Sequence, residues 1–160
     1  MRKVLLSAIA VIALTSSAYA DVWHVDRKTS PVDDSKEVYI STSSTTSSSA
    51  GALVIRCKEH ETDVMVVPGG FGYNGASVKV LVRLDSGQAL PDTWNGSTDG
   101  QAVFYPGSVP FFSKVLSQHH KFFIRVFASY DGEATDATFD LDGLTEKLPE
   151  VADACGWKFK

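Results

Sequence analysis

Three stretches of alternating polar and apolar residues each carry one arginine among apolar neighbours. They are ALVIRCK with Arg56, SVKVLVRLD with Arg83 and KFFIRVFASY with Arg125. Because successive side chains of a β-strand point to opposite faces, each arginine is expected to point away from the apolar set of its own strand. If the three strands are neighbours, the guanidinium groups form a ladder that can bind a carboxylate or a phosphate. The alternative is a structural network of ion pairs with the nearby carboxylates Asp33, Asp34, Asp85 and Asp99.

Residues that could catalyse a reaction are present, but they do not form a known catalytic motif. The sequence has no nucleophile elbow of the G-x-S-x-G type. The GGFG run at 69–72 lacks the lysine and hydroxyl residue of a phosphate-binding P-loop. His119 and His120 are adjacent, so on a strand their side chains point apart, and we interpret them as exposed turn residues. The sequence therefore predicts a protein that is not an enzyme and has no metal or cofactor.

Two cysteines, Cys57 and Cys155, remain as candidates for covalent or metal chemistry. In an oxidising compartment an even number of cysteines favours a disulfide, which would tie the C-terminal segment to a central strand. The alternative is two separate buried thiols. A zinc site is disfavoured because Cys57 and His60 lie close together but no second Cys/His pair completes four ligands.

The first twenty residues have the composition of a signal peptide. Arg2 and Lys3 precede an apolar run at 4–14, and small residues then end in Ala-Tyr-Ala at 18–20. The apolar run is too short for a membrane-spanning helix, which needs about 20 apolar residues. We therefore predict that residues 1–20 are a cleaved signal peptide and that the mature protein lies in the periplasm or is secreted, without a membrane span.

The charge and length of residues 21–160 limit the kinds of partner. The formal net charge of the whole chain is −4, and it becomes −6 without residues 1–20, which hold two of the basic residues and no acidic one. A negative protein is a poor match for nucleic acid or an anionic membrane. The length suits one domain at 21–160, and the sequence gives no indication of an oligomeric state.

Alternating segments bounded by turn residues predict a mainly β fold. The predicted strands are 37–42, 52–58, 62–67, 77–85, 101–105, 121–130 and 137–141. This pattern favours an antiparallel β-sandwich or a partly open barrel. Helices are predicted at 110–118 and at 144–154, where Pro149 is expected to split or kink the second one. The Ser/Thr tract at 41–49 is interpreted as a flexible surface loop, and the glycine-rich stretch at 68–76 as a mobile loop.

An ordered set of short segments resembles the VasI/TagO family of exported proteins associated with type VI secretion. The segments are Trp23, SPVDDS at 30–35, VYI at 38–40, LVIRC at 53–57, VRLD at 82–85, Trp94, STD at 97–99, AVF at 102–104, ATFDLDGL at 137–144 and ACGW at 154–157. The resemblance implies an exported accessory protein without a cofactor. It supplies no catalytic residues.

The polar and aromatic members of these segments are expected to meet in three dimensions. They are Asp33, Asp34, Ser35, Arg56, Arg83, Asp85, Thr98 and Asp99 around Trp23, Trp94 and Phe104. A buried Asp–Arg network of this kind would order the N-terminal segment against the sheet, and its loss would be costly.

Two functions remain open from the sequence. The first is a protein-binding accessory module that acts on an envelope or secretion-apparatus protein, with the sheet edges and the loop carrying Phe71 and Tyr73 as contact points. The second is a binder of a small anionic ligand or glycan that uses the arginine face and Trp94. A flat apolar patch would favour the first function, and a deep pocket lined by Arg83 and Trp94 would favour the second.

Overall fold

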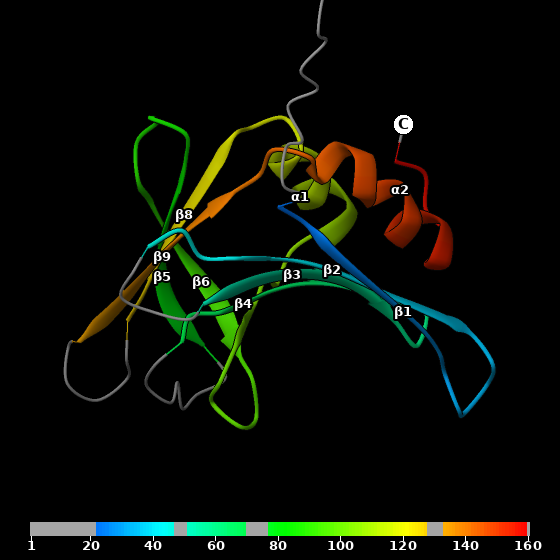
Figure 1. The fold of residues 1–160 in the computed structure, drawn as a ribbon. Helices are drawn as coiled ribbons and strands as arrows, with labels where there is room; N and C mark the ends of the chain where they lie inside the picture. The colour runs from blue at the N-terminus through cyan, green and yellow to red at the C-terminus, as the bar shows by residue number, and fades with distance from the viewer. Residues whose placement is uncertain (1–21, 47–50, 70–76, 128–132, 160) are drawn as a thin grey trace, which may run out of the picture.

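The computed structural model describes residues 22–46, 51–69, 77–127 and 133–159, and these residues form one antiparallel sheet with two helices (Figure 1). The strands are His24–Thr29 (β1), Lys36–Ser43 (β2), Ala52–Lys58 (β3), Glu61–Val67 (β4), Val78–Leu84 (β5), Leu90–Gly96 (β6), Val103–Phe104 (β7), Lys121–Phe127 (β8) and Ala134–Asp140 (β9). The helices are Val109–Leu116 (α1) and Leu144–Ala154 (α2). The strand order is β1-β2-β3-β4-β7-β6-β5-β8-β9.

The sheet curls, so that β9 at one end meets the chain that continues β2, the strand next to the other end. The short strand β7 pairs with both β4 and β6 and joins the β1–β4 half to the half made of β5, β6, β8 and β9, whose strands run across the first (Figure 1). At the far end, Ser44 forms an isolated bridge with Phe139, and the Thr45 amide donates to the Thr138 carbonyl at 2.7 Å. The predicted fold class is confirmed: the chain is mainly β and antiparallel, in a partly closed arrangement.

The alternation that predicted the strands also builds the core. Leu53, Ile55 and Cys57 of β3 are fully buried, because every second residue of the strand faces the same side. Both helices cover the β1–β4 half (Figure 1). Leu148 and Val151 bury one face of α2, and each such side chain contributes roughly 1.5–3 kcal/mol when it leaves water.

An aromatic cluster fills the junction between α1 and the second half of the sheet. Trp94 of β6 is fully buried, and its ring centroid lies 5.9 Å from that of Phe112 and 6.3 Å from that of Phe122. Phe122 in turn stacks on Phe139 of β9 at 6.2 Å. The cluster therefore connects four elements, β6, α1, β8 and β9.

A disulfide joins the two predicted cysteines. Cys57 near the end of β3 is bonded to Cys155, the residue that follows α2, across 98 positions of sequence. The bond fixes α2 against the buried face of β3, as predicted.

Some elements differ from the sequence prediction. The strands β1 and β6 were not predicted, because most of their side chains are exposed and they lack an apolar alternation. The loop prediction at 41–49 is wrong at its start, because β2 continues to Ser43 and buries Thr42 opposite Leu53. The split at Pro149 is also wrong, since α2 runs through this residue as one helix held by its buried neighbours and the disulfide. The predicted signal peptide and most of the glycine-rich loop lie outside the described residues.

Removing the disulfide should weaken the fold strongly. In the double variant Cys57→Ala/Cys155→Ala, the unfolded chain regains the freedom of a loop of about 100 residues, which should lower the free energy of unfolding by about 2–5 kcal/mol. Urea denaturation of the mature wild type and the variant measures this difference. An unchanged midpoint would show that α2 is held by packing alone.

Candidate functional site

The three arginines do not form a ladder. Arg56 lies on β3, whereas Arg83 and Arg125 lie on the adjacent strands β5 and β8. Three strands, β4, β7 and β6, separate β3 from β5 in the sheet. The expectation that all three guanidinium groups share one binding face is therefore wrong, because the topology places Arg56 in the other half of the sheet.

Two of the arginines are engaged in cross-strand ion pairs. Arg56 Nε donates to Asp63 Oδ2 at 2.9 Å, and its guanidinium lies 5.7 Å from the centre of the Phe104 ring. Arg125 makes two hydrogen bonds of 2.7 Å each with Asp136, the residue directly opposite on β9, and lowers the pKa of that carboxyl. Pairs of this partly exposed kind contribute up to about 1 kcal/mol each. These two arginines are therefore structural, and their partners are not the carboxylates expected from the sequence.

Arg83 differs from the other two. Its side chain is exposed, and its guanidinium lies 5.3 Å from the centre of the Phe123 ring, which stands opposite it on β8. Within the described residues no carboxylate lies within 4 Å of its nitrogens. The expected buried Asp–Arg network around Arg83 is therefore not formed.

Asp85 joins the end of β5 to the start of β8. Its Oδ1 accepts hydrogen bonds from the backbone amides of His120 and Lys121 at 2.9 and 2.8 Å, and its Oδ2 lies 2.8 Å from Nδ1 of His119. The residue itself has φ = 48°, a left-handed backbone conformation that asparagine and aspartate adopt more often than most other residues. The His119 hydrogen bond, followed by the two amides, lowers the pKa of Asp85 to about 2. Asp85 is therefore an ionised clamp between two strand ends that are distant in sequence.

An open hollow of about 600 Å³ lies beside this clamp. It is lined by Arg83, Asp85, Ser86, His120 and Lys121. On its His120 side, Nδ1 of that residue lies 2.6 Å from Asp142 Oδ1, and this contact raises the pKa of His120. We name this site the clamp hollow.

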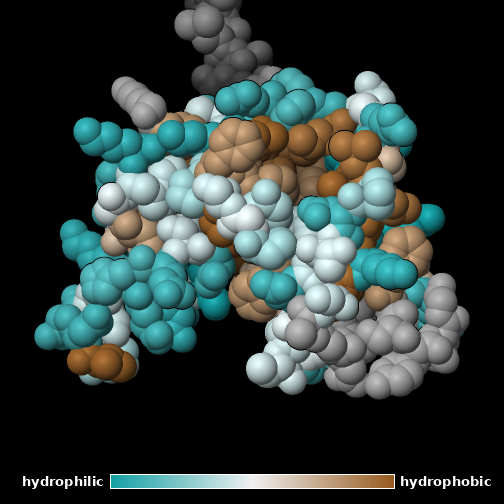
Figure 2. Space-filling view, turned by 180° about the vertical axis from the view of Figure 1, so that it is seen from behind, coloured by the Kyte–Doolittle hydropathy of each residue, from teal (hydrophilic) through white to brown (hydrophobic). Residues whose placement is uncertain are grey.

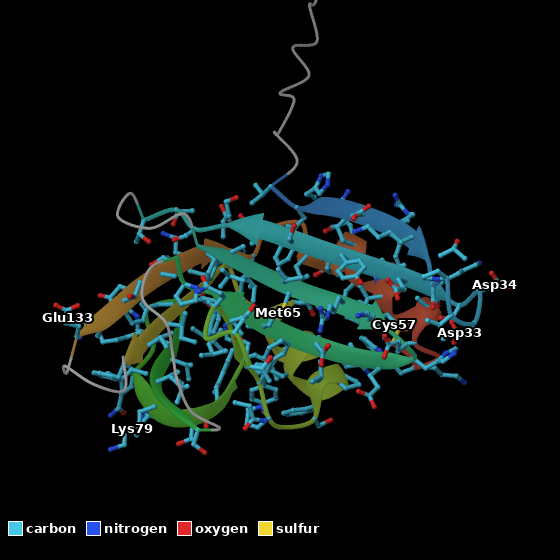
Figure 3. All side chains as sticks on the ribbon, turned by 90° about the horizontal axis from the view of Figure 1, so that it is seen from below. Asp33, Asp34, Cys57, Met65, Lys79 and Glu133 are labelled. Atoms are coloured by element: carbon cyan, nitrogen blue, oxygen red, sulfur yellow. A yellow bond between two sulfur atoms is a disulfide. The ribbon has the colours of Figure 1, made fainter. Side chains whose placement is uncertain are left out.

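The other predicted site residues lie elsewhere. Asp33 and Asp34 are at the tip of the β1–β2 hairpin, at the opposite end of the molecule from Lys79 of β5 (Figure 3). The Asp33 carboxylate accepts from the side chain and amide of Ser35, and the hydroxyl contacts are the main reason why its pKa falls to about 2. Asp99 closes the turn between β6 and β7 with a 2.6 Å bond from the Ser97 hydroxyl.

Trp94 is buried in the core and does not line a pocket with Arg83. Its indole N–H donates to Asp92 Oδ2 at 3.0 Å, and the ring belongs to the aromatic cluster. The expected meeting of the whole set is therefore wrong, although Arg56 does lie over the Phe104 ring. The carboxylates Asp33, Asp85 and Asp99 are bonded within their own turn or across one strand pair, whereas the Trp23 indole N–H is buried without a partner among the described residues.

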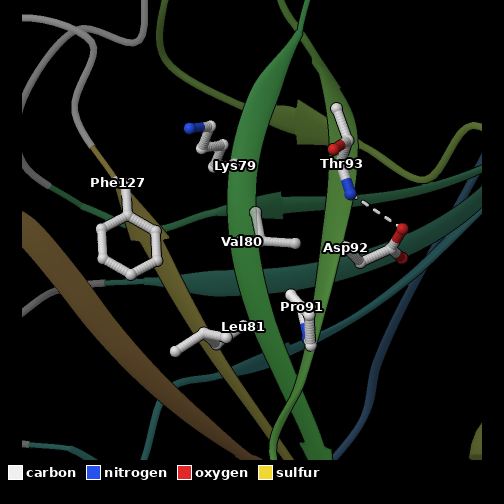
Figure 4. Close-up of a pocket in the computed structure, with 7 residues that line it drawn as sticks. All are labelled: Lys79, Val80, Leu81, Pro91, Asp92, Thr93 and Phe127. Carbon is white, nitrogen blue, oxygen red and sulfur yellow. Dashed lines mark hydrogen bonds between the residues drawn. The ribbon is translucent and has the colours of Figure 1, made fainter.

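The sequence analysis missed an apolar surface on the outside of β5, β6 and β8. A hollow of about 480 Å³ is lined there by Lys79, Val80, Leu81, Pro91, Asp92, Thr93 and Phe127 (Figure 4). We name the set Leu81, Pro91 and Phe127, with Lys79 and Thr93 beside it, the outer sheet face. The available signal was in KFFIRVF, where Phe123 and Phe127 alternate with the core residues and so had to point outward. In the space-filling view from behind, hydrophobic residues gather in the upper part of the molecule, interspersed with hydrophilic ones (Figure 2).

The described residues contain no group of three or more His, Cys, Asp or Glu side chains placed to hold a metal ion. In the same part of the chain, none of the helices has the length and apolar character needed to cross a membrane.

Comparison with known proteins supports the fold alone. No protein-family model matches the sequence, and no curated protein matches it. Among solved structures, the chain is similar to invasion associated protein B from Bartonella henselae, with a TM-score of 0.57 and 11% sequence identity over 83% of this chain and 93% of that chain. At this level of identity the likeness shows a shared architecture. The VasI/TagO resemblance stays a prediction.

The placement of Arg83 predicts a small effect on stability. Arg83→Ala removes an exposed cation–π contact and should lower the free energy of unfolding by less than about 1 kcal/mol. Trp94→Ala, which opens a cavity inside the aromatic cluster, should cost about 3–5 kcal/mol. Chemical denaturation of both purified variants measures these two losses. If Arg83→Ala lowered the free energy of unfolding as much as Trp94→Ala, Arg83 would belong to a buried network after all.

The Asp85 clamp predicts an acid-dependent contribution to stability. Because the pKa of Asp85 is lowered from 3.8 to about 2 in the folded protein, its stabilising effect is complete above about pH 4 and is lost as the pH falls to about 2. The difference in urea midpoint between wild type and Asp85→Asn should therefore narrow over this range. Asp33 also titrates in this range, but it is present in both the wild type and the variant, so its effect on the difference cancels. A difference in urea midpoint that stayed constant with pH would contradict the role of Asp85 as a clamp.

Proposed function

We propose that this protein is an exported, non-enzymatic binding module of the bacterial cell envelope, which docks to another protein through the outer sheet face. The observation that carries the proposal is an apolar hollow on the solvent side of the sheet, lined by residues of three adjacent strands. Antiparallel sheets that cover a core on one side usually present polar residues on the other. Leu81, Pro91 and Phe127 interrupt this rule on three adjacent strands.

The shape of this face favours a macromolecular partner. An apolar small molecule, which lacks charged contacts, gains its affinity by burying most of its surface in an enclosed pocket. The hollow on the outer sheet face is open to solvent, and its lining side chains come from neighbouring strands that curve beneath them (Figure 4). Exposed apolar patches with a polar rim are typical of protein-interaction sites. Lys79 and Thr93 supply such a rim.

The sheet edges are less suited to binding than this face. On the edge strand β1, Asp26 pairs with Lys28 at 2.9 Å, and Arg27 pairs with Glu150 of α2. Charged side chains of this kind protect an edge against pairing with another strand. At the other end of the sheet, the chain at Ser44 and Thr45 bonds to β9. Docking by the face is therefore preferred over strand addition.

Export is supported by two independent features. The disulfide between Cys57 and Cys155 fits an oxidising compartment, and residues 1–20 have the composition of a cleaved signal peptide. We place the mature protein in the periplasm or outside the cell.

We assign no catalytic activity to this protein. Among the described residues, His119 and His120 face different carboxylates, and no serine or cysteine nucleophile is bonded to either ring. The resemblance to VasI/TagO proteins makes an envelope or secretion-apparatus protein the expected partner. An association with type VI secretion would follow if that partner belongs to such an apparatus.

Substitutions on the outer sheet face should strongly weaken partner binding without unfolding the protein. We expect Leu81→Ser and Phe127→Ser to lower recovery of the partner by about tenfold or more in affinity capture from the native envelope, because apolar anchors dominate interfaces. The matched control is Val32→Ser, which removes an apolar side chain that is 86% exposed at the tip of the β1–β2 hairpin. Quantitative mass spectrometry measures recovery. Equal losses in all three variants would rule out this face as the docking site.

A further inference from the structure

The clamp hollow presents two cations that have no ion-pair partner among the described residues. Arg83 and Lys121 are both exposed, and neither has a carboxylate oxygen within 4 Å there. Arg83 rests on the Phe123 ring, and this stacked position leaves the N–H groups along the guanidinium edge available as donors. In contrast, Arg125 donates two hydrogen bonds to Asp136, and Arg56 donates one through Nε to Asp63.

Among the described residues, the carboxylate inside the hollow is paired with His119 and not with either of these cations. Asp85 uses Oδ1 for two backbone amides and Oδ2 for His119. Its role is to hold the β5 end and the β8 start together, which places Arg83 and Lys121 on the same side of the sheet. Ser86, which directly follows the clamp residue, adds an exposed hydroxyl to the lining.

The acidic groups next to the hollow also have partners. Asp142 Oδ1 lies 2.6 Å from His120, which favours the protonated imidazole, and Asp140 Oδ1 accepts the Asp142 amide at 2.9 Å. A protonated His120 is a donor at both ring nitrogens. The hollow thus combines a guanidinium, an ammonium, an imidazole and a hydroxyl as donors.

We propose that the clamp hollow binds the phosphate group of a small, soluble, phosphate-bearing molecule. A phosphate has several acceptor oxygens and is matched by a guanidinium fork together with an ammonium point charge. The hollow, at about 600 Å³ and open to solvent, leaves room for the group that carries the phosphate. The net charge of −6 without residues 1–20 repels an anionic membrane surface, so a soluble molecule is favoured over a lipid headgroup.

This site is separate from the proposed docking face. The residues that line the clamp hollow and the residues of the outer sheet face do not overlap. Leu81→Ser and Phe127→Ser should therefore retain phosphate binding, and the two proposals can fail independently.

The test is an NMR titration of the mature protein with inorganic phosphate and, in parallel, glycerol phosphate. We expect saturable shifts of the Ser86, His120 and Lys121 amides below about 10 mM ligand. Arg83→Gln and Lys121→Gln should each weaken binding by about tenfold, because each removes a charged donor. The control Lys36→Gln removes an exposed lysine at the start of β2 and should leave binding unchanged. Denaturation curves verify that the variants are folded.

Several outcomes would overturn the proposal. Shifts that do not saturate, or that persist in Arg83→Gln and Lys121→Gln, would show that the hollow is not the site. Acetate binding as tight as phosphate binding would refute the phosphate class. Binding to phosphatidylglycerol vesicles but not to soluble phosphates, with phosphatidylcholine vesicles as reference, would replace the soluble ligand by a membrane surface.

Discussion

The bond between Cys57 and Cys155 is the constraint on which the β1–β4 half of the molecule depends. It anchors the end of α2 to β3, and two other contacts hold the helix and the segment after it. Arg27 of the edge strand is bonded to Glu150, and the Trp157 indole N–H donates to Thr62 of β4 at 2.9 Å. Because α2 covers β2 and β3, this half has a buried face even though its outer side is solvated. Its exposed side chains can then form ion pairs without contributing to the core.

The cross-strand neighbour decides what each strand arginine does. The three sequences around Arg56, Arg83 and Arg125 look alike, yet their positions face Asp63, Phe123 and Asp136. A carboxylate on the neighbouring strand accepts hydrogen bonds from the guanidinium. A phenyl ring in the same position makes a cation–π contact and accepts none of these hydrogen bonds. The three similar arginine side chains therefore have different partners because of the register in which their strands pair.

Local patterns could be predicted from the sequence, and register could not. The alternation in ALVIRCK and VKVLVRL placed β3 and β5 correctly, and the spacing of Leu144, Leu148 and Val151 placed α2. β6 was missed because its only buried side chain is Trp94. The Asp85 clamp joins residues 34 to 36 positions apart, and no single-sequence pattern links such residues before the pairing of β5 with β8 is known. Of the residues that line the clamp hollow, the sequence therefore identified Arg83 and Asp85 as candidates but not Ser86, His120 or Lys121.

The strand β5 lies where the two candidate surfaces meet. Its outward positions read Lys79, Leu81 and Arg83, and they lead into the clamp at Asp85. Lys79 and Leu81 belong to the open apolar face, while Arg83 belongs to the polar hollow at the strand end. Since side chains on one face of a strand are about 7 Å apart, a partner seated on the apolar face would come close to the hollow. A ligand held by Arg83 would then alter the charge that such a partner meets, which gives the two surfaces a physical means of acting on each other.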